Sequence, residues 1–131
     1  MTIREICSVI EQEAPLSLQE KYDNSGLLVG EYDQSVTGVL VCLDVNEAVI
    51  DEAINLNCNL IIAHHPLIFH GLKQLTGSNE VQRCVIKAVK NDVAIYAAHT
   101  NLDNVPGGVN GKIAGKLGLM NCRILSPMQN S

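Results

Sequence analysis

Hydrophobic positions follow two distinct periods along the chain. Ile3, Ile6 and Ile10 recur at helical spacing behind Thr2 and Glu5, which have the pattern of a capping box. Similar helical periods predict further helices over residues 46–54, 79–88 and 109–117. Short apolar runs bounded by turn residues predict strands at residues 27–29, 38–43, 59–63 and 93–98, and a last short strand at Ile124 and Leu125.

This order of elements predicts an α/β fold. The helices have the length of crossover connections between parallel strands, so we expect a three-layer-like β-α-β-α-β unit with a largely parallel or mixed sheet covered by helices. The 131 residues suffice for one domain with a real core, and we interpret residues 1–131 as a single domain. Because aromatic residues make up only 3% of the chain, that core must consist of Ile, Val, Leu and Ala.

Histidines follow two of the predicted strands. The third strand runs directly into His64 and His65, and the fourth runs into His99, with Asp103 shortly after it. The carboxyl ends of parallel strands meet at one edge of a sheet, which is where open α/β sheets hold their ligands. Imidazole and carboxylate groups are ligands that divalent ions such as zinc prefer. The pattern therefore predicts a metal site at this edge.

The histidine pair leaves several interpretations open. Consecutive strand residues point to opposite faces, so His64 and His65 reach one centre only if the strand has ended, which Pro66 favours. Otherwise each histidine serves a different ion, as in two-metal sites whose ions lie ~3.5–4 Å apart. A histidine after a strand can also act simply as a cap or hydrogen-bond partner. His70 lies in a long loop after Pro66, and we interpret it as solvated or substrate-facing rather than as a ligand.

Two further aspartates lie beside predicted strands. Asp44 closes the strand at residues 38–43 and can reach the same edge of the sheet, although a role as a helix cap or turn residue is an equal alternative. Asp23 and Asn24 precede the first strand, and we interpret them as a structural turn rather than as catalytic residues.

Charge and cysteine content exclude several classes of protein. The net charge is −5 and no cluster of Lys and Arg occurs, so affinity for nucleic acid has no visible source. The apolar runs are far shorter than a membrane span, and the N-terminal pattern is that of an amphipathic helix rather than a signal peptide. The five cysteines are odd in number and lack C-x-x-C spacing. We therefore expect free thiols that bind no metal, and a cytoplasmic location.

Five short motifs occur in a recognisable order that covers nearly the whole chain. They are YDNSGL at residues 22–27, LDV at 43–45, IAHHPL at 62–67, HTNLD at 99–103 and GGVN at 107–110. This combination resembles the Nif-three-like family of dinuclear metal proteins, whose members often carry the name GTP cyclohydrolase I type II. HHP together with HTNLD is a much more specific signal than either motif alone.

The resemblance implies that His64, His65 and Asp103 are metal ligands and that His99 lies beside the site. It further implies two divalent ions per full-length chain (Zn, Fe, Mn, Co or Ni) and a ring-like homo-oligomer such as a hexamer. The family's remaining His and Glu ligands lie in a C-terminal half that has no counterpart here. Either the chain is an N-terminal fragment or another chain completes the site. We favour a fragment, and expect its incomplete site to hold metal weakly and to be catalytically weak or inert.

On this basis the sequence predicts a divalent-metal-dependent hydrolase that acts on a nucleotide or a related small molecule. In that hypothesis the metal activates a water molecule, and His99 or Asp44 acts as a catalytic residue that orients it or relays a proton. The alternative is a metal-binding regulatory or protein-interaction module without turnover. A third interpretation is a structural α/β domain whose histidines only cap strands.

Overall fold

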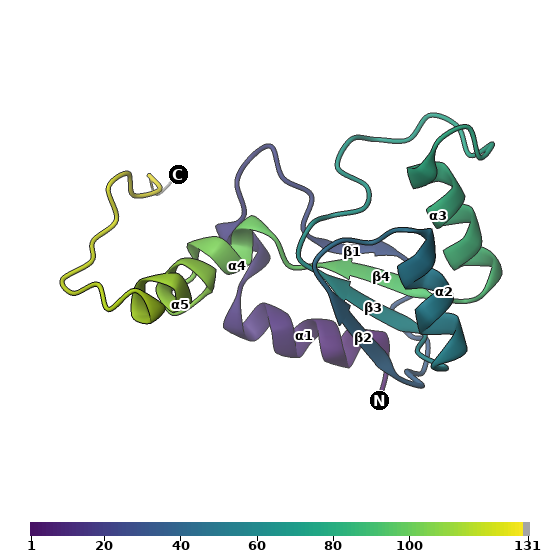
Figure 1. Ribbon diagram of the computed structural model, residues 1–131, viewed down its shortest axis with the longest axis horizontal. Helices are drawn as coiled ribbons and strands as arrows, with labels where there is room; N and C mark the ends of the chain where they lie inside the picture. Colours follow the sequence, from purple (N-terminus) through teal and green to yellow (C-terminus); the bar gives the residue numbers. More distant parts are fainter. Residues whose placement is uncertain (130–131) are drawn as a thin grey trace.

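The computed structural model describes residues 1–129, which form a four-stranded sheet flanked by helices (Figure 1). The elements in chain order are α1 (Ile3–Glu13), the 3-10 helix η1 (Leu16–Leu18), β1 (Gly26–Val29), β2 (Val39–Cys42), α2 (Glu47–Asn55), β3 (Leu60–Ala63), α3 (Glu80–Lys90), β4 (Ala94–Ala97), α4 (Thr100–Asn104) and α5 (Val109–Lys116).

The sheet is mixed, with the strand order β1-β4-β3-β2. Strands β2, β3 and β4 run parallel to one another, whereas the edge strand β1 is antiparallel to β4. In the parallel part Ala63 at the end of β3 lies opposite Ala97 at the end of β4. The predicted α/β class is confirmed, and the two strands that precede the histidines end level with one another.

Helices cover both faces of the sheet and create two apolar cores. Alternation along β3 sends Leu60 to one face, where Ile3 and Cys7 of α1 pack, and Ile61 to the other. That second core is formed against α2 and α3 by residues that include Ile50, Ala53, Cys84, Val85 and Ala88. The result is the predicted three-layer arrangement, with α1 on one face and α2 and α3 on the other (Figure 1).

The helix starts follow from local side-chain caps. The Thr2 hydroxyl accepts a hydrogen bond from the Glu5 amide, and the Glu5 carboxylate accepts one from the Thr2 amide, which completes the predicted capping box. Asn46 and Asn79 cap α2 and α3, because each side chain accepts a hydrogen bond from the backbone amide of the third residue of its helix. These caps fix where each crossover helix begins, and hence how the strands return to the sheet.

The C-terminal part of the chain departs from the sequence predictions. Helix α5 was expected to face the core, but Ile113 is 51% exposed and Leu117 is 69% exposed. The helix and the segment after it extend away from the sheet (Figure 1). The expected last strand is also wrong, because Ile124 and Leu125 lie outside any strand and are largely exposed. An apolar run forms a strand only where a neighbouring strand is within reach, and this segment has left the sheet.

Two other expectations concern the whole chain. All five cysteines are free, as predicted, and Cys7 and Cys84 are buried as small core residues. Among the described residues no helix combines the length and the apolar character needed to cross a membrane.

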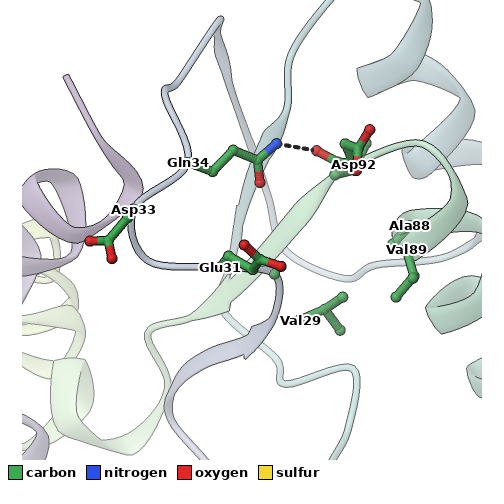
Figure 2. A pocket seen from close by; sticks show the side chains of 9 residues that line it. Val29, Glu31, Asp33, Gln34, Ala88, Val89 and Asp92 are labelled. Carbon is green, nitrogen blue, oxygen red and sulfur yellow. Dashed lines mark hydrogen bonds between the residues drawn. The ribbon is translucent and has the colours of Figure 1, made fainter.

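A groove of about 660 Å³ lies at the end of the sheet where β4 begins (Figure 2). Its lining includes the exposed acidic side chains of Glu31, Asp33 and Asp92, and the Gln34 amide donates a hydrogen bond to the Asp92 carbonyl at 2.8 Å. The predicted metal ligands lie at the opposite end of β4.

Candidate metal centre

The carboxyl ends of β3 and β4 position the three histidines of the cluster. Strand β3 ends at Ala63, and the His64 and His65 amides that follow it donate to the carbonyls of Cys42 and Leu43 at the end of β2. His99 follows β4 and immediately precedes α4. Short parallel strands of equal length therefore deliver both histidine segments to the same edge.

The ring nitrogens of His64, His65 and His99 gather at this edge. One nitrogen from each ring lies within 4.8 Å of the others, and the ring centroids are 5.1–5.5 Å apart. Nitrogens bound to one tetrahedral ion at ~2.0–2.1 Å would lie roughly 3.4 Å apart, so a small closure would bring the rings onto a common ion. His64 and His65 share the cluster because β3 has already ended when the chain reaches them.

Asp103 adds a carboxylate to the cluster. Its Oδ1 lies 3.7 Å from His64 Nε2, and α4 places it one turn after His99. His64 and Asp103 are partly exposed, with side-chain exposures of 21% and 28%. His64 and Asp103 therefore lie close together, as the sequence predicts, and both remain accessible to solvent.

Each histidine is held at Nδ1 by an oxygen that accepts a hydrogen bond. His64 Nδ1 lies 2.8 Å from the carbonyl of Ala98, His65 Nδ1 lies 2.7 Å from Asp44 Oδ1, and His99 Nδ1 lies 2.8 Å from Asp23 Oδ1. A carbonyl or an ionised carboxylate has no proton to donate, so all three Nδ1 atoms must donate. In each neutral imidazole the proton is therefore on Nδ1, and Nε2 keeps its lone pair.

This tautomer makes the contact between His64 and Asp103 a test for a metal. His64 Nε2 and Asp103 Oδ1 are both acceptors and lie 3.7 Å apart. Two acceptors at this distance repel each other, and a cation bound by both atoms, a proton on the ring or a bridging water molecule removes that repulsion. A divalent ion bound by imidazole nitrogen and carboxylate oxygen is one such cation, so the residues present fit a metal of that kind.

The electrostatics of the site also suit a cation. Asp23, Asp44 and Asp103 surround the cluster, and among the described residues their ion-pair partners are histidines rather than Lys or Arg. Burial alone raises the pKa of Asp23, but hydrogen bonds from His99, Thr100 and the Asn24 amide outweigh it and hold the pKa well below its ordinary value. Asp23 is thus a permanent negative charge beside the cluster.

The other sequence predictions for this region have mixed outcomes. Asp44 reaches the site through His65, as its place after β2 suggested. The ring of His70 lies 5.0 Å from that of Phe69 and is not part of the histidine group. None of the cysteines contributes to the cluster.

Sequence reasoning missed two residues that support the site. Asp23 directly follows the turn at Lys21 and Tyr22, and its carboxylate also holds His99. Asn101 is fully buried; its amide donates to the Ala14 carbonyl at 2.9 Å, and its oxygen accepts from the His99 amide at 3.0 Å. Both residues lie inside the motifs YDNSGL and HTNLD, which was the only signal available for them.

The comparisons with known proteins agree with this architecture. A family model described as Duf34/NIF3 (NGG1p interacting factor 3) matches residues 1–131. The chain belongs to this family. A relative in Clostridium acetobutylicum, named GTP cyclohydrolase 1 type 2 homolog, is 40% identical over 126 residues, which are 96% of this chain and 47% of the relative. A relative of the same name in Bacillus subtilis is 43% identical over 124 residues, 95% of this chain and 33% of the relative.

Solved structures of Duf34/NIF3 relatives confirm the fold. A Bacillus cereus protein related to NIF3 is 46% identical with a TM-score of 0.90, covering 98% of this chain and 35% of that one. Reduced HcgD from Methanocaldococcus jannaschii is 33% identical with a TM-score of 0.85, covering 92% of this chain and 48% of that one. The chain therefore spans between a third and a half of the length of these relatives. The predicted family resemblance is confirmed.

Proposed function

We propose that His64, His65, His99 and Asp103 form a binding site for divalent metal. The observation that carries this proposal is the pairing of two acceptor atoms, His64 Nε2 and Asp103 Oδ1, within a group of three imidazoles whose Nδ1 atoms are all engaged. This assignment adds His99 to the ligands that the sequence predicts. An imidazole whose Nδ1 is held by a carboxylate can also carry a proton at Nε2, so the Asp23 contact is compatible with either role.

We further propose that the complete protein is a metal-dependent hydrolase of a nucleotide or a related small molecule. A bound divalent ion lowers the pKa of a water molecule and polarises a substrate oxygen. Asp44 would hold the His65 ring in place, and its exposed carboxylate could also accept a proton, since 63% of its side chain is accessible to solvent. The cyclohydrolase names of the relatives support this reaction class.

Metal binding can be tested with single alanine variants of the histidines. We expect the wild-type chain to take up Co²⁺ or Zn²⁺, and His64→Ala to lose at least tenfold in affinity because one of few ligands is removed. His70→Ala is the matched control, because that ring lies outside the cluster. Equal affinities of wild type, His64→Ala and His70→Ala would show that the cluster is not the site.

Turnover distinguishes the hydrolase from a metal-binding module without catalysis. The full-length protein, loaded with Mn, Fe, Zn or Co, should hydrolyse at least one member of a nucleotide panel, and His65→Ala should abolish that activity. Retained metal with no turnover across the panel would favour a regulatory or interaction module. A full-length protein that binds no metal would favour a structural role for the histidines.

We also propose that the complete protein forms a homo-oligomer. The edge strand β2 supports this, because Val41 and the following Leu43 are 75% and 60% exposed beside unpaired backbone groups. Light scattering on the full-length protein should show an assembly that dissociates in Val41→Lys, whereas a monomer at micromolar concentration would refute it.

A further inference from the structure

Asp23 has the most fully buried side chain of the anchors that hold the histidines. Its side chain has 0% exposure, and Oδ1 accepts from His99 Nδ1 at 2.8 Å and from the Asn24 amide at 2.7 Å. Oδ2 accepts from the Thr100 amide at 2.9 Å, from the Thr100 hydroxyl, and from the Ser25 hydroxyl at 3.1 Å. Five donors are thus shared between the two oxygens of this carboxylate.

The three anchors differ in strength. His64 is held by a neutral carbonyl, and His65 is held by Asp44, whose side chain is 63% exposed and screened by solvent. Only His99 is held by a carboxylate that is shielded from water, where electrostatic interactions are stronger. A carboxylate in this position fixes the tautomer and orientation of a ligating histidine and raises its basicity.

We infer that Asp23 is a positioning residue of the metal site, which keeps the proton of His99 on Nδ1 and directs the lone pair of Nε2 into the cluster. This inference rests on the proposed metal function, and it adds a residue that sequence reasoning placed in a structural turn. Asp23 does not contact the ion itself; it acts through His99.

The substitution Asp23→Asn should reverse the tautomer of His99. Asparagine has nearly the same shape, but one of its terminal atoms is an NH₂ group that only donates. Three donors from Thr100 and Ser25 favour an oxygen at the Oδ2 position, whereas only the Asn24 amide donates at the Oδ1 position, so we expect the NH₂ group to take the Oδ1 position at the cost of that one hydrogen bond. There it would donate to His99 Nδ1, and the ring proton would move to Nε2, which could then no longer bind metal.

The tautomer can be measured directly in the metal-free chain by two-bond ¹H–¹⁵N NMR of the histidine rings. In the wild type we expect a protonated Nδ1 and an unprotonated Nε2 for His99, and in Asp23→Asn the opposite assignment. Ser25→Ala is the matched control, because it removes one hydrogen bond to the same carboxylate without touching His99. A wild-type His99 with its proton on Nε2 would overturn the inference, even if Asp23→Asn failed to fold.

Metal affinity provides the second readout. We expect Asp23→Asn to bind Zn²⁺ roughly 10–100-fold more weakly than wild type, the usual effect of removing such a support, and Ser25→Ala to remain within about threefold. Wild-type affinity in a folded Asp23→Asn variant would refute the positioning role. Absence of Zn²⁺ binding in the wild type would instead refute the proposed function, and the NMR result would still decide whether Asp23 sets the tautomer.

Discussion

Removal of the Asn101 side chain should destabilise the fold as well as the site. The side chain links the end of α1 to the backbone of His99, through hydrogen bonds of 2.9 Å to the Ala14 carbonyl and 3.0 Å from the His99 amide. Asn101 is 0% exposed and Ala14 is 1% exposed, so water cannot easily replace these partners. Asn101→Ala would leave a buried acceptor and a largely buried donor without hydrogen bonds.

The size of the effect follows from these two groups. A buried polar group that loses its partner costs about 1–3 kcal/mol, so two such groups cost roughly 2–6 kcal/mol. For a domain of this size each kcal/mol lowers Tm by roughly 3–5 °C, which predicts a decrease of about 6–30 °C. Since domains of this kind are stable by about 5–15 kcal/mol, the variant should fold with a greatly reduced margin.

Urea denaturation of two asparagine variants tests this reasoning. Asn110→Ala is the control, because Asn110 is exposed and makes a single hydrogen bond of 3.1 Å, to the Asp103 carbonyl. Its loss should cost less than about 1 kcal/mol, with an unchanged m-value in both variants. If Asn101→Ala were no more destabilised than Asn110→Ala, the buried hydrogen bonds would not support the site as argued.

Two further predictions concern the turn before α5 and the thiols. A Cβ at Gly108 would lie 1.9 Å from a backbone oxygen, so Gly108→Ala should lower the free energy of unfolding by several kcal/mol. Nothing lies within 4 Å of a Cβ at Gly111, so Gly111→Ala should raise that free energy by up to about 1 kcal/mol through helix propensity. Thermal denaturation of the two variants measures both effects. Burial raises the pKa of the Cys7 and Cys84 thiols to about 11. At pH 8 a thiol reagent should therefore modify the exposed Cys122 first and the two buried thiols only after unfolding. Rapid labelling of Cys84 in the native chain would contradict this.

Local patterns were sufficient to predict most of the fold. The apolar run before His64 is typical of a strand that is buried on both faces of a sheet. Pro66 marks where this segment ends, and so indicates that the two histidines lie at the end of the strand. The orientation of β1 was not predictable, because short apolar strands look alike whether they pair in parallel or antiparallel. Helix α5 shows the opposite error, since a helical apolar period predicts an amphipathic face but not what covers it.

The supporting residues of the site were not accessible to the same reasoning. Asp23 and His99 are 76 positions apart, and nothing in the residues between them indicates that they touch. A turn accounts for an aspartate at position 23 without any contact to His99, so the local pattern contained no indication of a second role. The position of His99 at the edge of the sheet, in contrast, was predictable, because His99 follows its own strand.

The long separation between Asp23 and His99 also has a consequence for how the protein is made. The anchors of His65, His64 and His99 close chain segments of 21, 34 and 76 positions, so the Asp23 contact requires the largest loss of chain entropy. During synthesis it cannot form until residues beyond β4 have left the ribosome, and contacts of such high sequence separation form slowly. A nascent chain would therefore present its histidines unanchored, and competence to hold metal would appear only with completion of the native topology.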